Sequence, residues 1–227
     1  MKKKLDSVKQ AIKAAAESCG RSPNSIRLVA VSKTMPAEKV KEAIDAGVDI
    51  IGENYIQESL EKFKALSQYR ISWHFIGHLQ TNKAKYAVRL FDLIHTVDKL
   101  KLAKELNKEA KKHGKIQQIL MQVNTSQEVS KSGTGIDNAL GLAKEISVLK
   151  NLSLKGLMTI PPFFNSPEKA RPFFKKLMEI KNIIKKASIP NISMDELSMG
   201  MTGDFKVAIE EGATLVRIGT AIFGKRN

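Results

Sequence analysis

A lysine stands where a short apolar run ends near the start of the chain. The run from Arg27 to Ser32 is rich in Leu, Val and Ala, which is typical of a strand buried on both faces. At the end of such a strand, the amine of Lys33 can face a cleft with apolar walls. Desolvation lowers the pKa of an amine, and a neutral amine is the nucleophile that forms a Schiff base with an aldehyde. A solvated strand-end lysine is the ordinary alternative, which these residues alone leave open.

Two clusters of glycine and threonine follow apolar runs near the end of the chain. Gly200, Thr202 and Gly203 form one cluster, and Gly219 and Thr220 form the other. Glycines let backbone N–H groups close on a phosphate, hydroxyls add donors, and a helix that begins near Thr202 would point its positive end at the anion. Turn glycines with an ordinary helix cap at Thr202 are the alternative for either cluster alone. Taken together, the two clusters support a phosphate site about as well as they support ordinary turns with a helix cap.

An arginine interrupts the apolar run at 215–219. A buried guanidinium needs a partner because removing its charge from water is costly. Two explanations are open for Arg217. It can form a structural ion pair, with Glu53 or Asp204 as candidate partners, or it can contact an acceptor atom of a ligand.

The histidines and the cysteine do not indicate metal or thiol chemistry. His74 and His78 are four residues apart, but they fall on a strand-to-loop segment without a His-Glu-x-x-His pattern, so we predict no zinc site. We interpret His95, at a strand end, as a buried and hydrogen-bonded histidine rather than a ligand contact. Cys19 falls on a predicted helix, and the sequence has no Gly-x-Ser-x-Gly elbow, so neither feature supplies a nucleophile.

Apolar runs and helical stripes alternate along the chain and would position these residues. The predicted strands cover 27–34, 48–52, 71–77, 93–97, 119–124, 154–160, 194–199 and 215–219, and the predicted helices cover 5–19, 36–46, 56–63, 82–89, 102–110, 139–149, 173–184 and 204–211. Eight strands alternating with helices predict an α/β protein with a single (β/α)8 TIM barrel. A doubly wound open sheet is the second choice, because no Gly-x-Gly-x-x-Gly fingerprint follows the first strand.

The order of these elements places the candidate residues at one end of the barrel. No stretch has the composition of a linker, so we expect residues 1–227 to form one domain. In such barrels the active-site residues lie at the carboxyl ends of the strands, and a phosphate group is often bound by the loops after the seventh and eighth strands. Lys33 and both glycine–threonine clusters fall at these positions.

Composition narrows the function classes. The chain has 227 residues, of which 42% are hydrophobic, and a net charge of +15. The basic residues are mostly lysines scattered along amphipathic segments, and aromatic residues do not interleave with them, so solvated helix faces explain the charge better than a nucleic-acid surface. Cys19 is the only cysteine, and neither a secretory signal nor a membrane-length apolar run is present. We therefore expect a cytoplasmic protein that binds neither nucleic acid nor membranes.

Six segments of the chain carry a family resemblance. They run in order across nearly the whole chain, at 31–34, 52–55, 73–83, 156–160, 197–202 and 216–220, and the Trp-His-Phe-Ile-Gly-His-Leu-Gln-Thr-Asn-Lys run at 73–83 is especially specific. These segments closely resemble the pyridoxal phosphate homeostasis protein family, also called YggS-like or proline synthetase co-transcribed. The resemblance implies a barrel of the alanine racemase N-terminal-domain type (fold type III) that binds pyridoxal 5′-phosphate (PLP).

The resemblance also assigns roles to particular residues. It implies a Schiff base at Lys33 and a contact between Arg217 and the pyridine nitrogen. It implies phosphate contacts at Thr202, Gly219 and Thr220, where Thr202 replaces the usual serine and keeps a hydroxyl donor. The residues implied as cofactor neighbours are Lys33, Asn54, Ser198, Thr202, Arg217, Gly219 and Thr220.

The family's role is control of the free cofactor level, with effects on amino and keto acid balance. A cation at the ring nitrogen weakens the ring as an electron sink, because it disfavours the pyridinium form. A racemase also needs acid or base groups on both faces of the substrate α-carbon. Alanine racemase takes one of them from a further β-domain, for which this chain leaves no room, and only Tyr55 or His78 offers a second base. We therefore expect a PLP carrier without a catalytic residue.

Two other functions stay open at this stage. One is a small PLP-dependent amino-acid racemase that uses the same Schiff base, and the other is a basic binding module. Bound cofactor would exclude the binding module, and amino-acid turnover would exclude the carrier. As partners we expect PLP and the apo forms of PLP-dependent enzymes, and we expect a monomer or a weak dimer.

Overall fold

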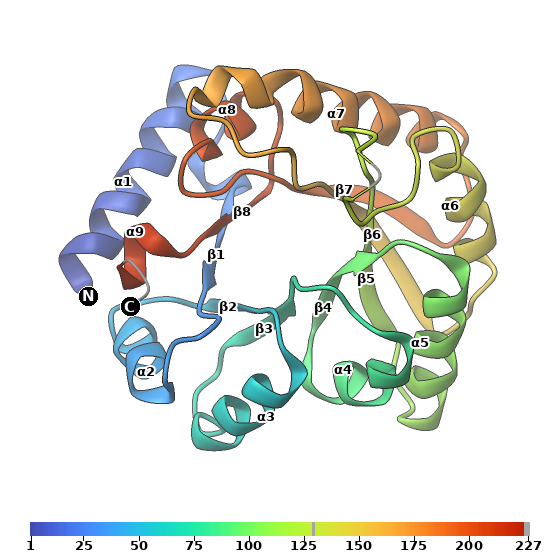
Figure 1. The fold of residues 1–227 in the computed structure, drawn as a ribbon, viewed down its shortest axis with the longest axis horizontal. Coiled ribbons are helices and arrows are strands. Elements are labelled where there is room, and N and C mark those ends of the chain that lie inside the picture. The colour runs from blue at the N-terminus through green and yellow to red at the C-terminus, as the bar shows by residue number, and fades with distance from the viewer. Residues whose placement is uncertain (129, 225–227) are drawn as a thin grey trace.

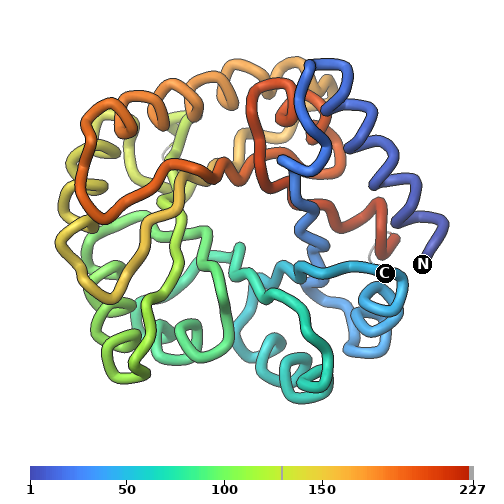
Figure 2. Tube along the Cα trace, turned by 180° about the vertical axis from the view of Figure 1, so that it is seen from behind, coloured from blue at the N-terminus to red at the C-terminus, as the bar shows by residue number. Residues whose placement is uncertain are grey.

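The strands of this protein close into a ring, and the helices pack around its outer side (Figure 1; Figure 2 gives the view from behind). The computed structural model describes residues 1–128 and 130–224. Within these residues, eight parallel strands follow one another around the barrel in chain order. The strands are β1 (Arg27–Val31), β2 (Ile50–Glu53), β3 (Ser72–Phe75), β4 (Leu93–Val97), β5 (Gln117–Gln122), β6 (Leu152–Met158), β7 (Ile192–Ser198) and β8 (Leu215–Ile218).

The helices bury apolar stripes against the barrel, as their spacing predicts. In the first helix, for example, Leu5, Val8 and Ile12 recur at helical spacing and are all buried. Within the described residues, no helix is both long enough and apolar enough to span a lipid bilayer. The helices are α1 (Lys2–Ser18), α2 (Ala37–Asp45), α3 (Ile56–Ala65), α4 (Ala84–Leu90), α5 (Leu100–Lys112), α6 (Ala139–Ser147), α7 (Arg171–Lys186), α8 (Phe205–Glu210) and α9 (Thr220–Phe223), with 3₁₀ turns at Pro23–Ser25, Thr81–Lys83 and Pro167–Ala170.

Pairing between the first and last strands decides between the two predicted architectures. β1 pairs in parallel with β8, in a register that sets Arg27 opposite Leu215 and Ala30 opposite Ile218. β1 also pairs with β2, so the ring closes and leaves no open edge among the described strands. The predicted (β/α)8 barrel is therefore confirmed, and the open doubly wound sheet is excluded.

The seventh strand is present although it contains two acidic residues. Asp195 is exposed, so its carboxylate keeps its contact with water. Glu196 pairs with Arg27 and also accepts a hydrogen bond from the hydroxyl of Thr214, at 2.6 Å. Neither carboxylate is left buried without a partner, and the strand is compatible with both charges.

The inside of the barrel holds an apolar layer and, nearer the carboxyl ends of the strands, a polar one. The apolar layer is Val29, Ile50, Leu93, Leu120, Met158 and Leu215, which form a buried cluster of their own. Alternate residues of a strand point to the same side. Two residues further along β4 and β8 come His95 and Arg217, and both are buried.

A chain of hydrogen bonds runs through the polar layer. Nη1 of Arg217 donates to Oγ of Ser198 at 2.6 Å, Ser198 Oγ lies 2.9 Å from Nδ1 of His95, and Nε2 of His95 lies 3.0 Å from Nδ1 of His74. A guanidinium can only donate, so Ser198 accepts from Arg217, and with His95 in the Nε2–H tautomer the hydrogen of Ser198 goes to Nδ1 of His95. Nε2 of His95 then carries the ring proton and donates it to His74. The interpretation of His95 as a buried, hydrogen-bonded histidine is confirmed.

The chain requires both imidazoles to be neutral. Burial lowers the pKa of His74 to about 3, and burial, with the nearby His74 and Arg217, lowers the pKa of His95 well below its ordinary value. A proton on either ring would add a charge beside buried Arg217 and would remove an acceptor from the chain. Acid should therefore weaken the barrel from within.

The first prediction concerns stability in acid. The folded-state pKa of His74 lies below the ordinary value of 6.5, so the unfolded chain binds more protons as pH falls from about 6.5 toward about 3. The free energy of unfolding should therefore fall over that range, by up to about 1.4 kcal/mol per pH unit for each histidine. His74→Gln should reduce this slope by about the contribution of one histidine. The slope is measured by urea unfolding between about pH 7 and pH 5.

Exposed His113, at the end of α5, provides the matched control, because His113→Gln should leave the dependence unchanged. An equally steep dependence in wild type and His74→Gln would contradict the neutral chain.

Candidate cofactor site

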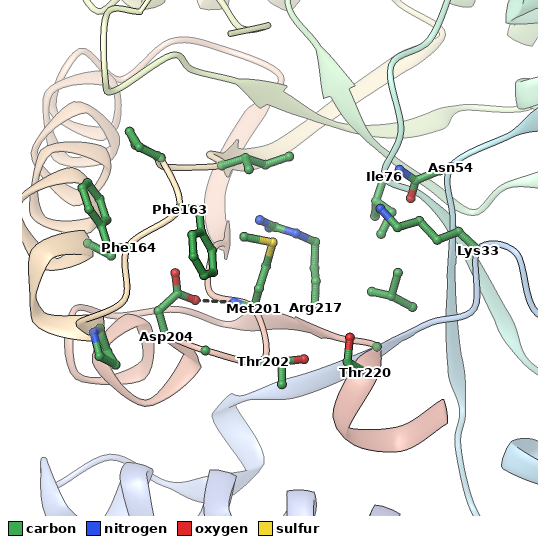
Figure 3. Close-up of a pocket in the computed structure, with 17 residues that line it drawn as sticks. Lys33, Asn54, Ile76, Phe163, Phe164, Met201, Thr202, Asp204, Arg217 and Thr220 are labelled. Carbon is green, nitrogen blue, oxygen red and sulfur yellow. Dashed lines mark hydrogen bonds between the residues drawn. The ribbon is translucent and has the colours of Figure 1, made fainter. Parts of the chain in front are cut away.

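A cavity of about 370 Å³ opens at the carboxyl ends of the strands and collects the predicted site residues. Its lining contains every one of them except Ser198 (Figure 3). Ser198 is fully buried and reaches the cavity through its hydrogen bond to Arg217. A concave site with a few convergent polar groups on apolar walls is typical of small-ligand pockets in barrel folds.

The main chain around Lys33 is held by a buried ion cluster. Nζ of Lys62, on α3, donates to the carbonyl of Ser32 and to Oε1 of Glu53, both at 2.7 Å. The backbone N–H that follows Lys33 donates to Glu58, which also pairs with Lys62. These contacts fix the main chain on both sides of Lys33, which lies two residues beyond the end of β1. The side chain of Lys33 points into the cavity beside Asn54 (Figure 3).

This ion cluster was not predicted from the sequence. Lys62 is 3% exposed and Glu53 is fully buried, so the pair is part of the packed interior. Burial raises the pKa of Glu53, and the ammonium of Lys62 opposes that rise. The available signal was the i, i+4 spacing of Glu58 and Lys62 on a helix that follows the Glu53 strand, but many surface pairs have the same spacing.

Arg217 is buried, but neither of its predicted ion partners contacts it. Its guanidinium donates to Ser198 and, through Nη2, to the carbonyl of Thr159 at 2.8 Å. Of the two explanations left open for Arg217, the structural ion pair is therefore excluded for these candidates: Glu53 pairs with Lys62, and Asp204 acts on Arg217 only through its charge. Burial lowers the pKa of Arg217 to about 10, which leaves it cationic at neutral pH. A guanidinium has five N–H donors, and donors beyond these two bonds can meet a ligand.

The loop after β7 turns on Gly200 and Asp204. Gly200 has φ of +88°, and an added Cβ would lie 2.9 Å from the Cα of Phe205, so only glycine fits there. The helix predicted at 204–211 is present as α8, which begins at Phe205, but the suggested cap at Thr202 was wrong, because the N-cap is Asp204. Oδ1 of Asp204 accepts from the N–H of Met201 at 2.6 Å, which closes the loop on itself. Thr202 is thereby released from capping and lines the cavity.

The threonine-bearing loops lie together on one side of the cavity. Thr202 and Thr220 are adjacent in Figure 3, away from Lys33 and below Arg217 in that view. At Gly203, an added Cβ would meet no atom within 4 Å, so the backbone there is open to a ligand. At Gly219, a Cβ would lie 3.1 Å from the carbonyl of Val31, so the β8 loop packs directly on β1.

Asn54 presents a buried acceptor without a partner. Its Oδ1 is inaccessible to water and has no hydrogen bond to any described residue. Its backbone is fixed by Gly77, where an added Cβ would lie 2.2 Å from the carbonyl oxygen of Asn54. An unpaired buried acceptor is unfavourable unless something donates to it. Oδ1 of Asn54 therefore lacks a hydrogen bond in this arrangement of the side chain.

Several lining residues were not predicted. Phe163 and Phe164 follow β6 and form part of the wall opposite Lys33 (Figure 3). Phe164 stacks on Phe173 of α7, with ring centroids 5.7 Å apart, whereas Phe163 is 85% exposed. The Pro161-Pro162 pair that ends the strand was the available signal, but it does not indicate where the following side chains point.

The two candidate second bases lie outside this lining. Tyr55 is 55% exposed and does not line the cavity. His78 is exposed and lines a neighbouring cavity, which it shares with Asn54. Cys19 is exposed at the end of α1, far along the chain from the strand ends that build the site.

The chain is similar to proteins of known family. The sequence profile described as "Alanine racemase, N-terminal domain" matches residues 4–227. A protein of Aquifex aeolicus named "Pyridoxal phosphate homeostasis protein" is 44% identical over 223 residues, which cover 98% of this chain and 97% of the relative.

Solved structures agree with the sequence matches. PipY of Synechococcus elongatus, whose structure was determined with PLP bound, is 33% identical and superposes with a TM-score of 0.82 over 94% of this chain and 99% of PipY. Alanine racemase of Corynebacterium glutamicum superposes with a TM-score of 0.70 over 96% of this chain and 60% of the racemase, at 12% identity, which is a likeness of fold alone.

These matches cover nearly the whole chain, and the structural ones agree with the barrel. The chain belongs to the pyridoxal phosphate homeostasis protein family, built on the barrel of the alanine racemase N-terminal domain.

Proposed function

We propose that this protein binds PLP as a reversible Schiff base on Lys33 and gives it up intact, without substantial turnover of amino acids. The observation that carries the proposal is that Lys33, Arg217 and the hydroxyls of Thr202 and Thr220 surround one cavity. The binding of PLP by PipY, a relative of nearly the same length, supports the choice of ligand.

The lining fits the chemical groups of PLP. Its phosphate needs donors, and the hydroxyls of Thr202 and Thr220 and the open backbone at Gly203 can supply them. Its ring nitrogen needs a donor if it carries no proton, and Arg217 has N–H groups beyond those bound to protein atoms. Asn54 also belongs to the lining, beside Lys33 (Figure 3).

The surroundings of Arg217 favour holding the cofactor over chemistry on it. When bound, PLP supplies an aldehyde that captures amines reversibly and a ring that can withdraw electrons. Arg217 stays cationic because its partners, Ser198 and the Thr159 carbonyl, are uncharged and cannot take its proton. A fixed cation disfavours a proton on the atom that it faces, so electron withdrawal by the ring is weakened.

The proton-exchanging groups of the lining also favour a carrier. Turnover at an amino-acid α-carbon needs acid or base groups on both faces. Apart from Lys33 and Arg217, the titratable side chain among the described lining residues is Asp204. Asp204 lies across the cavity from Lys33 (Figure 3), and its Oδ1 is occupied by the N–H of Met201. This arrangement provides no well-placed second base, which leaves the racemase as the weaker alternative.

The second prediction identifies the attachment point. Protein incubated with PLP and reduced with borohydride should carry the adduct on Lys33, because its amine lines the cavity that fits the cofactor. Peptide mapping locates the adduct, and Lys33→Ala should abolish it at stoichiometric PLP. Lys83 and Lys131 serve as internal controls on the same sample. An adduct on either of them, with Lys33 unmodified, would disprove the assignment.

The third prediction concerns the phosphate end of the site. Thr202→Ala should weaken PLP binding by about 1.5–3 kcal/mol, since a hydrogen bond to a charged group is lost. That corresponds to a rise of roughly 10- to 150-fold in Kd, measured by equilibrium titration of the visible absorbance. Thr202→Ser keeps the hydroxyl and should bind nearly as the wild type does. Equal affinity in wild type and Thr202→Ala would remove this residue from the phosphate site.

The fourth prediction separates carrier from catalyst. On one sample, α-proton exchange is measured across the common amino acids, and cofactor transfer is measured to the apo form of a PLP-dependent enzyme. We expect transfer without exchange, and we expect Lys33→Ala to lose the transfer. Stereospecific exchange at enzymatic rates of roughly 1 per second or more would refute the carrier and establish the racemase.

A further inference from the structure

Lys33 stands on a tight turn that follows the strand. The N–H of Met35 donates to the carbonyl of Ser32 at 3.0 Å, which closes a turn with Lys33 and Thr34 at its two central positions. Thr34 has φ of +65°, in the left-handed region. A positive φ at the second central position is characteristic of a type II turn, where glycine or asparagine is the usual residue.

Threonine is an unfavourable residue at that position. Its Cβ carries two heavy atoms, which crowd the backbone when φ is positive. Four described non-glycine residues have a positive φ, and Thr34 is the only β-branched one among them. Such a conformation is strained, and it persists only where the surrounding structure holds it. The contacts of this turn should therefore show what holds it.

One helix binds both ends of the strained turn. The backbone N–H of Thr34 donates to Oε1 of Glu58 at 2.5 Å, and the carbonyl of Ser32 accepts from Nζ of Lys62 at 2.7 Å. Glu58 and Lys62 are four residues apart on α3 and pair with each other. The carbonyl of Ser32 therefore accepts two hydrogen bonds, one that closes the turn and one that ties the turn to the helix.

Glu58 is not needed to join α3 to the barrel. Nζ of Lys62 also donates to Oε1 of Glu53, and this buried pair already links the helix to β2. Glu58 lies at the solvent side of the pair, where its side chain is 24% exposed and its carboxylate reaches the N–H of Thr34. The contact that Glu58 adds is thus specific to the turn that carries Lys33.

The shape of this turn decides where the side chain of Lys33 leaves the main chain. Lys33 lies between the two residues that α3 binds, and its side chain extends into the cavity beside Asn54 (Figure 3). Schiff-base formation joins the amine nitrogen to the carbon of an aldehyde and releases one molecule of water, so the nitrogen must reach that carbon. A misplacement of about 1 Å can slow such a step by about 100-fold.

We propose that Glu58 is a positioning residue for Lys33. By accepting from the N–H of Thr34 and pairing with Lys62, it stabilises the strained turn, and the turn directs the lysine amine toward an aldehyde in the cavity. The proposal rests on the proposed function, in which Lys33 is the attachment point. It adds a residue from outside the described cavity lining to the groups that capture the cofactor.

The test compares two ligands that differ at the reacting carbon. PLP carries an aldehyde there, whereas pyridoxine 5′-phosphate carries an alcohol and forms no Schiff base. Protein freed of cofactor is mixed with saturating PLP, and Schiff-base formation is followed by visible absorbance, while pyridoxine 5′-phosphate binding is measured by equilibrium dialysis. We expect Glu58→Ala to slow Schiff-base formation about tenfold or more and to keep the affinity for pyridoxine 5′-phosphate within about twofold of wild type.

Two further variants separate the reach of Glu58 from its charge. Glu58→Gln keeps the length of the side chain and an acceptor oxygen, so it should recover most of the rate. Glu58→Asp keeps the charge but is one methylene shorter, so it should react slowly, and it carries the test if melting curves show that Glu58→Ala does not fold. Glu61, on the same helix and outside the ion cluster, provides the matched control, since Glu61→Ala should react as wild type does.

A change at Thr34 tests the strain itself. Asparagine adopts the left-handed conformation more readily than threonine does. Thr34→Asn should therefore raise the melting temperature, and in the Glu58→Ala background it should restore much of the rate of Schiff-base formation.

Three results would overturn the positioning role. They are a wild-type rate in both Glu58→Ala and Glu58→Asp, a loss of pyridoxine 5′-phosphate binding as large as the loss of rate, and no restoration of the rate by Thr34→Asn. Borohydride mapping of the wild type separates these results from failure of the proposed function. An adduct on Lys33 together with one of them refutes the role of Glu58 alone, and an adduct elsewhere refutes the attachment point as well.

Discussion

The burial of one positive charge inside the barrel constrains the rest of the site. Arg217 is 3% exposed, and the protein gives it no carboxylate partner, only a serine hydroxyl and a backbone carbonyl. An uncompensated buried charge is unfavourable by several kcal/mol, and a folded barrel must offset that cost elsewhere in its core. A ligand atom that accepted a hydrogen bond from Arg217 would offset part of this cost. The arginine is therefore better explained by what it can bind than by what it contributes to stability.

The partners of Arg217 also determine which protons can move. Ser198 accepts from the arginine, so its own hydrogen is available to Nδ1 of His95, and with His95 in the Nε2–H tautomer the hydrogen bonds run in one direction from Arg217 to His74. Both imidazoles must then be neutral, in agreement with their lowered pKa values. The interior cannot accept a proton from the cavity without breaking this chain. Such a site is better suited to binding an electron-deficient ring than to transferring protons to or from a ligand.

The rim of the barrel is rigid where the cofactor would bind. The Lys62–Glu53 pair fixes the chain beside Lys33, Gly77 allows close packing against Asn54, and the Asp204 turn closes the loop after β7. Lys33 extends from this fixed frame into the cavity (Figure 3). A rigid frame favours retention of a bound molecule, because little conformational entropy is lost on binding. Release of the cofactor would then depend on exchange at Lys33.

Much of this protein could be predicted from local patterns in its sequence. Apolar runs of strand length located all the strands, and glycines next to hydroxyls after β7 and β8 located the threonine-bearing side of the cavity, because alternation and turn chemistry are local properties. The motifs also indicated Lys33 and Arg217 as site residues. Three features required the folded chain: the uncharged partners of Arg217, the burial of Lys62, and the contact between Glu58 and the turn that carries Lys33. Each depends on which strands become neighbours and in what register, and residues far apart in the sequence carry no local record of that pairing.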